Sequence, residues 1–174
     1  GKETIIFNNS YIIDQLSIFM KVLVLIFSFL VLFSSREYLK ITKIDRIEYP
    51  IIMLGAILGV IIMISSYDLI IFYLGLELQS LCLYILAAFK KDDESSTEAG
   101  LKYFVLSALA TCILLYGCSL IYGFTGSTNF EVISDNLTNA GLGAIFGVVF
   151  IIVALAFKKD DESSTEAGLK YFVL

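Results

Sequence analysis

One long apolar run, residues 67–89, constrains the fold more than any other stretch because it carries a carboxylate. Its sequence is YDLIIFYLGLELQSLCLYILAAF, and Glu77 stands near the centre. Roughly 20 apolar residues, each rising ~1.5 Å, span the ~30 Å hydrocarbon core of a bilayer, so the run is predicted to be a transmembrane helix. An ionised group at the centre of such a helix costs about 2.5–3.5 kcal/mol on insertion scales. Glu77 should therefore face protein or water and have a cationic partner.

The composition predicts a polytopic membrane protein. Of the 174 residues, 58% are hydrophobic, and the mean hydropathy is +0.87. Apolar runs of this number and length exceed what one soluble core of this size can bury. We therefore predict an all-α transmembrane helix bundle with about five spans. The spans cover about residues 12–33, 50–66, 67–89, 101–122 and 142–157.

Several kinds of chemistry are excluded by the residues present. The chain has no histidine, which excludes HExxH zinc chemistry and a Ser-His-Asp triad. Its three cysteines lie in apolar runs without a CxxC pair, so neither a metal site nor a disulfide is expected. No nucleotide-binding loop and no basic patch with interleaved aromatics occurs. We expect no cofactor in this chain and no nucleic-acid partner.

The links between spans give local predictions. Pro50 should open the second span, and Ser95, Ser96 or Thr97 should cap the fourth. Residues 124–140 are interpreted as a loop, and Lys158 is expected to end the fifth span. Two GxxxG pairs should allow close helix packing. They are Gly55 with Gly59, and Gly143 with Gly147.

Positive residues are distributed unequally between the two sides that five crossings would create. The side that holds residues 35–47, residues 90–98 and the chain after 158 is rich in lysine and arginine, whereas the other side has only Lys2. Its positive residues are Arg36, Lys40, Lys43, Arg46, Lys90, Lys91, Lys158 and Lys159. Because positive residues favour the inner side, the N-terminus should face outward and the polar links inward.

An exact internal repeat is present. Residues 88–106, AFKKDDESSTEAGLKYFVL, recur unchanged as residues 156–174. Structural repeats of membrane proteins diverge, so a perfect copy indicates a recent event. Three explanations are open: recombination in the gene, a chimeric or truncated reading frame, or an error in assembling the sequence. Residues 159–174, a copy of 91–106, are expected to form an inward polar tail that ends in a frayed or interfacial helix.

Three blocks of the sequence resemble a known family. They are YDLIIFYLGLELQSLCLYILAAFK, STEAGLKYFVLSALATCILLYGCSLIYGFTGSTNF and GVVFIIVALAFK. They resemble the central part of subunit 2 of NADH dehydrogenase (respiratory complex I), the counterpart of the bacterial subunit N. The resemblance covers residues 48–158 strongly and residues 5–47 loosely. It implies part of an antiporter-like, proton-pumping subunit of the membrane arm.

The resemblance also implies site residues. Glu77 matches the family's glutamate, Lys158 matches the lysine that pairs with it, and Lys102 matches a further lysine near the line of proton transfer. From the residues alone, Lys158 is equally well interpreted as an inward anchor, and Lys102 as the partner of Glu98 four residues earlier. Tyr73, Ser80 and Tyr84 share the face of Glu77 by helical spacing and could bond to it or pack in the core.

Two functions are weighed. The leading one is a proton-translocating subunit of NADH:ubiquinone oxidoreductase, without redox chemistry of its own. Sites for NAD, FMN, iron–sulfur clusters and ubiquinone are then expected in partner subunits, beside other membrane-arm subunits and a lipid bilayer. The alternative is a truncated or chimeric membrane protein that pumps nothing.

By the resemblance, family helices are missing at both ends of this sequence. The rest of the subunit is then supplied by a second chain, or the sequence is partial. The expected location is the mitochondrial inner membrane, with the bacterial plasma membrane as the alternative.

Overall fold

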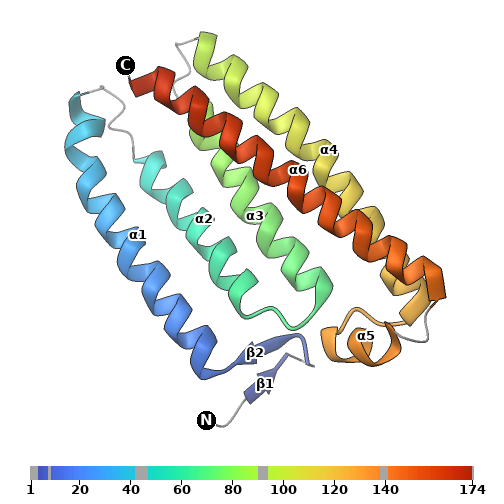
Figure 1. Cartoon of the computed structure of the whole chain (residues 1–174). Helices are drawn as coiled ribbons and strands as arrows, with labels where there is room; N and C mark the ends of the chain where they lie inside the picture. The colour runs from blue at the N-terminus through green and yellow to red at the C-terminus, as the bar shows by residue number, and fades with distance from the viewer. Residues whose placement is uncertain (1–3, 8, 42–46, 90–93, 138–140, 174) are drawn as a thin grey trace.

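Helices make up most of the chain, as the apolar runs predict. The computed structural model describes residues 4–7, 9–41, 47–89, 94–137 and 141–173 (Figure 1). Two short strands, which the sequence did not predict, pair as an antiparallel hairpin before the first helix. The elements are β1 Thr4–Ile6, β2 Tyr11–Ile13, α1 Gln15–Ile41, α2 Glu48–Ile64, α3 Leu69–Ala87, α4 Glu94–Thr125, α5 Phe130–Leu137 and α6 Gly141–Val173.

The helices agree with the predicted membrane bundle. Within the described residues, four of them contain segments that are long and apolar enough to cross a membrane. These segments are Gln15–Ser35, Leu69–Ala87, Ser96–Thr125 and Gly141–Lys159. Helix α2 is apolar but has only 17 residues, and Pro50 lies in its first turn, where a missing N–H is tolerated. The all-α transmembrane fold class is therefore confirmed.

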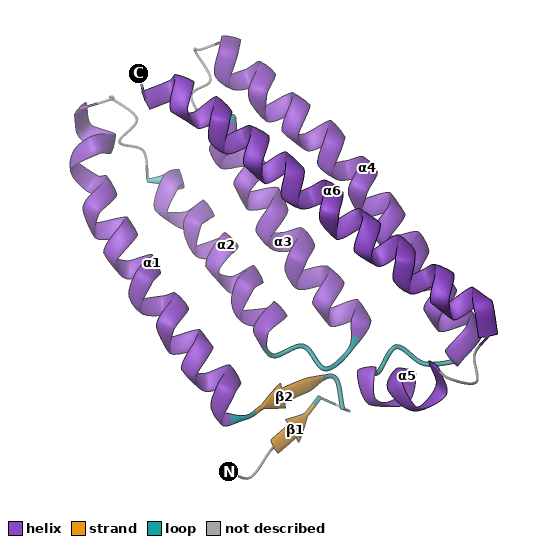
Figure 2. Ribbon diagram, in the orientation of Figure 1, coloured by secondary structure: helices purple, strands orange, loops and turns teal. Residues whose placement is uncertain are grey.

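Glycines bring neighbouring helices into close contact. A Cβ atom added at Gly59 of α2 would lie 2.7 Å from the carbonyl oxygen of Gly75 in α3. At Gly117 of α4 it would lie 2.8 Å from the carbonyl oxygen of Gly147 in α6. Both distances are too short for a side-chain carbon, so glycine is required where these backbones cross. These crossings hold α2 against α3 and α6 along α4, and further contacts between α3 and α4 place α3 between α2 and α4 (Figure 2).

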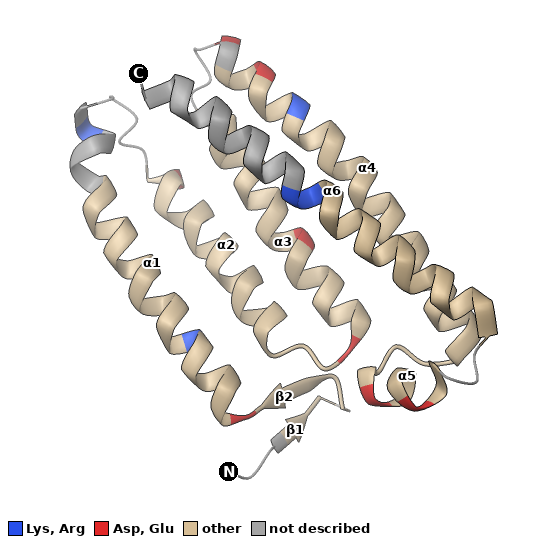
Figure 3. Cartoon of the chain, viewed as in Figure 1, with Lys and Arg blue, Asp and Glu red and all other residues tan. Residues whose placement is uncertain are grey.

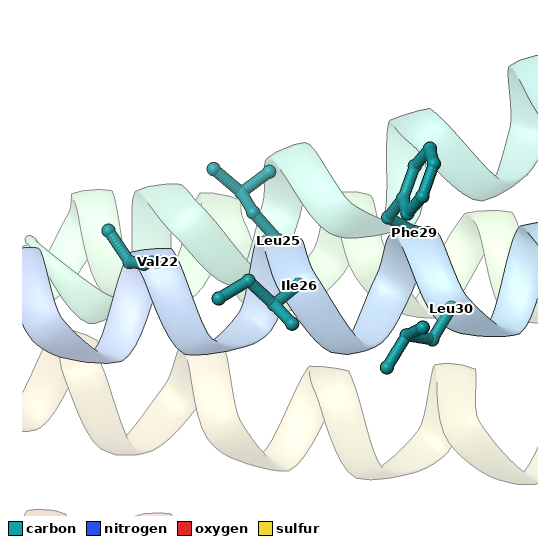
Figure 4. A pocket seen from close by; sticks show the side chains of 5 residues that line it. All are labelled: Val22, Leu25, Ile26, Phe29 and Leu30. Carbon is teal, nitrogen blue, oxygen red and sulfur yellow. The ribbon is translucent and has the colours of Figure 1, made fainter.

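Helix α1 lies at the edge of the bundle and exposes most of its surface. Only 6% of its membrane-length segment is buried. Five side chains of this helix line a shallow apolar groove (Figure 4), and they are Val22, Leu25, Ile26, Phe29 and Leu30. In a bilayer such a surface is compatible with acyl chains, which are as apolar as leucine.

One end of the bundle is closed by the hairpin, the α2–α3 turn and α5 (Figure 1). The Ile12 amide donates to the Ser65 carbonyl at 2.9 Å, and the Leu69 amide donates to the Thr128 carbonyl at 2.8 Å. The Asp68 carboxylate caps α3 by accepting from the Ile70 amide at 2.8 Å, and it also accepts from the Thr128 hydroxyl at 2.6 Å. Residues 124–140 were predicted to be a loop, and that prediction is wrong because they contain α5.

Two predicted helix ends are also wrong. Helix α4 begins at Glu94, so Ser96 lies inside it, and its hydroxyl instead donates to the carbonyl of Ala87 at the end of α3, at 2.9 Å. Helix α6 continues through Lys158 to Val173, so the predicted polar tail has a helical backbone. The inward residues Lys43, Arg46, Lys90 and Lys91 lie outside the described residues.

Candidate functional site

An ion pair joins the middle of α3 to α6. The Lys158 ammonium donates to Oε1 of Glu77 at 3.2 Å. The Lys158 side chain is 10% exposed and that of Glu77 is 20% exposed, so both charges are largely shielded from solvent. Charge-assisted hydrogen bonds of this kind are roughly twice as strong as neutral ones. Lys158 is thus the cation that the apolar surroundings of Glu77 require.

The sequence on both helices explains why the two charges meet. Glu77 is the ninth of the 19 residues of α3, and every other residue of this helix is uncharged. Lys158 follows Ala154 by one turn of α6, and Ala154 is 2% exposed in the core that α3, α4 and α6 share. Lys158, which was counted with the inward charges, therefore lies beside the middle of α3. Charged residues are few along the described parts of these helices (Figure 3), so a contact between two of them is distinctive.

A third side chain, from α4, contacts the same carboxylate. The hydroxyl of Thr111 donates to Oε1 of Glu77 at 2.6 Å. Sequence reasoning did not identify Thr111, because α4 carries several small polar residues and nothing in the sequence fixes the register of α4 against α3. The only available signal is that a threonine hydroxyl in a long apolar run requires a partner.

Lys102 does not take part in this contact. It forms an ion pair with Glu98, one turn earlier in α4, at 2.5 Å. Both side chains are exposed, 75% for Lys102 and 65% for Glu98. Lys102 is nine residues from Thr111, about 14 Å along the helix at ~1.5 Å per residue. The structure therefore brings two of the three predicted site residues together and leaves Lys102 apart on the surface of α4.

The three neighbours of Glu77 on α3 have other contacts. The Ser80 hydroxyl donates to the carbonyl of Leu76 at 2.7 Å. The Tyr84 hydroxyl donates to the hydroxyl of Ser107 in α4, and Tyr73 packs against the core. Tyr84 and Ser107 are both buried, so their contact holds α4 against α3 on the C-terminal side of Glu77.

The arrangement allows proton chemistry. A carboxyl group and an amine can each gain or lose a proton, and a hydroxyl can both donate and accept a hydrogen bond. Within the described ranges, no group of three or more histidine, cysteine, aspartate or glutamate side chains could hold a metal ion. The site thus consists of two titratable groups from two helices and one neutral hydroxyl from a third.

Comparison with known proteins gives a consistent result. Residues 66–161 match the family described as "NADH:quinone oxidoreductase/Mrp antiporter, TM". The chain is 58% identical over 153 residues to NADH-quinone oxidoreductase subunit N of Pelagibacter ubique, covering 88% of this chain and 32% of that protein. It is 51% identical over 157 residues to the same subunit of Beijerinckia indica, covering 90% and 33%. The chain thus spans about a third of the length of the curated relatives it matches.

Solved structures show the same likeness. Respiratory complex I from Thermus thermophilus with bound aureothin contains a chain that superposes with a TM-score of 0.70 at 29% identity, covering 89% of this chain and 33% of that one. The membrane-bound sulfane sulfur reductase, an archaeal respiratory membrane complex, gives a TM-score of 0.59 at 29% identity, covering 62% and 22%. The arrangement of helices around Glu77 therefore belongs to a known membrane fold.

Proposed function

Because this chain belongs to the NADH:quinone oxidoreductase/Mrp antiporter transmembrane family, we propose that it is part of a proton-translocating, membrane-arm subunit of an NADH-quinone oxidoreductase. The observation that carries the proposal is the shielded ion pair of Glu77 and Lys158 at 3.2 Å. Shielded, unlike-charged groups on two helices are a typical unit of proton transfer within membranes. As a subunit of such a translocase the chain contributes to an enzyme without performing redox chemistry itself.

The pair would couple two proton affinities. The gross attraction between unit charges at this separation is about 5 kcal/mol at an effective dielectric constant of 20, before desolvation is counted. When a proton binds Glu77 and an O–H bond forms, the attraction between the carboxylate and the ammonium of Lys158 is lost, and Lys158 releases a proton as its N–H bond breaks. Transfer of the carboxyl proton to the neutral amine then restores the ion pair. One proton has entered and one has left.

The relatives support a proposal for the location and the partners. The relatives named above are bacterial, so they do not support the mitochondrial inner membrane, and the bacterial plasma membrane is the location we propose. Proposed partners are the other membrane-arm subunits of the complex. Sites for NAD, FMN, iron–sulfur clusters and ubiquinone are proposed in partner subunits. Similarity to subunit N does not favour the alternative of a membrane protein that pumps nothing.

Lys102 remains a prediction. Its exposed ammonium pairs with Glu98 and does not reach Glu77 in this chain. If Lys102 takes part in proton transfer, further charged groups must approach it on the exposed face of α4 in the assembled subunit.

Replacement of Glu77 tests the proposal. In the assembled complex, reconstituted in liposomes, Glu77→Gln should abolish proton translocation driven by NADH while assembly is kept, because glutamine has nearly the same shape and does not titrate. Glu131→Gln is the matched control, since Glu131 is an exposed carboxylate of α5 at the closed end of the bundle. Translocation at the wild-type rate in Glu77→Gln would refute the proposed role.

A further inference from the structure

Oε1 of Glu77 accepts hydrogen bonds from two different helices. Thr111 of α4 donates at 2.6 Å, and Lys158 of α6 donates at 3.2 Å. The two donors differ in kind. The attraction of the ammonium depends on both groups being charged, whereas the hydroxyl is neutral and keeps its hydrogen-bonding capacity whatever the charge of the pair.

We propose that Thr111 is a positioning residue, which holds Glu77 beside Lys158 while the charges of the pair change. The inference rests on the proposed function, since it concerns how the pair keeps its geometry during proton transfer. When Glu77 binds a proton, its Coulomb attraction to Lys158 is lost, and a glutamate side chain has several rotatable bonds through which it could swing away. A second, uncharged contact prevents that movement.

The hydroxyl can serve both states of the carboxyl group. To the carboxylate it donates, as the structure shows. If the proton is on Oε2, Oε1 still accepts from Thr111, and if the proton is on Oε1, the hydroxyl turns and accepts from it. The contact of Thr111 with Glu77 thus survives protonation at either carboxyl oxygen. The ammonium of Lys158 has no acceptor atom, so it cannot accept a hydrogen bond from a protonated Oε1.

The surroundings of Thr111 make it suitable for positioning. Threonine is branched at Cβ, which restricts its first side-chain torsion in a helix. One turn before it, Ser107 is fully buried and bonded to Tyr84, and Ala110 and Leu114 beside it are 3% and 2% exposed. This segment of α4 is therefore packed firmly, so the hydroxyl of Thr111 is held at a fixed place relative to α3.

Two variants of Thr111 separate the effect of its hydroxyl from the effect of its shape. Thr111→Val keeps the branched shape and removes the hydroxyl, and Thr111→Ser keeps the hydroxyl. Thr125→Val is the matched control, because the Thr125 hydroxyl in the same helix donates to the backbone carbonyl of Ile121 at 2.7 Å, far along the chain from Glu77. Thr111→Ala provides a second hydroxyl-free variant where valine prevents assembly.

Two measurements on the assembled complex test the inference. One is the rate of NADH-driven proton translocation in liposomes, and the other is the infrared carboxylate band of Glu77, assigned by its loss in Glu77→Gln. We expect Thr111→Val to lower the rate roughly tenfold, the effect of losing one hydrogen bond to a charged group, and to shift the band. Thr111→Ser should stay within about twofold of wild type by the same reasoning, with an unshifted band. Thr125→Val should change neither.

The outcomes distinguish this inference from the proposed function. A wild-type rate and an unshifted band in Thr111→Val would overturn the inference, as would equal defects in Thr111→Val and Thr111→Ser, since packing would then explain both. If Glu77→Gln abolishes translocation in the same preparation, the proposed function stands even when the role of Thr111 fails. If Glu77→Gln translocates protons normally, the proposed function itself fails, and with it this inference.

Discussion

At the scale of single residues, the stability of the protein depends more on whether a shielded charge has a partner than on the charge itself. Removing one member of the pair leaves the other uncompensated, which costs about 3–5 kcal/mol for a buried pair, whereas replacing both members is often close to neutral. We therefore expect Lys158→Met to lower the free energy of unfolding by several kcal/mol. The double variant Glu77→Gln with Lys158→Met should recover most of that loss.

A double-mutant cycle by denaturant unfolding in one detergent measures this coupling. Lys159→Met is the control, because Lys159 is the next residue of α6 and is exposed. Costs that simply add in the double variant would show that the two side chains do not stabilise each other.

The site could be predicted from the sequence only where a residue is unusual in its surroundings. Glu77 was identified because a carboxylate in an apolar run is costly wherever its partner is. Lys158 was a candidate through the family resemblance, but the residues alone allowed an anchor equally well. Thr111 was missed because a threonine within an apolar helix is common, and its meeting with Glu77 depends on how α3 and α4 are rotated against each other, which no local pattern encodes.

At the scale of elements, glycine crossings determine how closely the helices pack. A Cβ at Gly59 would lie 2.7 Å from backbone atoms of both Gln79 and Gly75, so Gly59→Ala must push α2 away from α3. Overpacking of this kind typically costs about 1–3 kcal/mol. We expect Gly59→Ala to lower the thermal unfolding temperature of the purified protein.

Gly123→Ala provides the comparison for this prediction. Gly123 also lies in a helix, but a Cβ there has no atom within 4 Å. Alanine favours the helix by up to about 1 kcal/mol over glycine, so Gly123→Ala should be neutral or stabilising. Equal destabilisation by both variants would mean that the close approach at Gly59 does not decide stability.

The duplicated segment shows why helix boundaries could not be predicted locally. In the first copy α3 ends at Ala87 and α4 begins at Glu94, whereas the second copy is helical up to Val173. The sequence is identical, so its intrinsic propensity permits both states and tertiary contacts decide between them. At the first copy the Ser96 hydroxyl donates to the Ala87 carbonyl, and Gly100 packs against Ala88, so the start of α4 contacts the end of α3 there.

At the scale of the whole molecule, the two ends of the bundle differ in chemistry. The hairpin, the 65–68 turn and α5 are hydrogen-bonded into a cap at one end (Figure 2), and this cap is poor in lysine and arginine. At the opposite end α1 and α3 finish, and α2 and α4 begin (Figure 1). Lys40 lies in the last turn of α1. In the sequence, Lys43 and Arg46 stand between α1 and α2, and Lys90 and Lys91 stand between α3 and α4.

This asymmetry predicts the orientation in the membrane. Positive residues are retained on the inner side, so the cap should face outward and the start of α4 inward. After replacement of the native cysteines, single cysteines at Asp135 in α5 and at Glu94 in α4 can be labelled with a membrane-impermeant maleimide. Asp135→Cys should react in intact cells, and Glu94→Cys should react only after the cells are opened.

Leu109→Cys is the control, which should react neither in intact nor in opened cells. Leu109 lies on an exposed apolar face of α4, where lipid excludes the water that a thiolate requires. Labelling of both end positions from outside would show that α4 does not cross the membrane, and the reverse pattern would invert the predicted orientation.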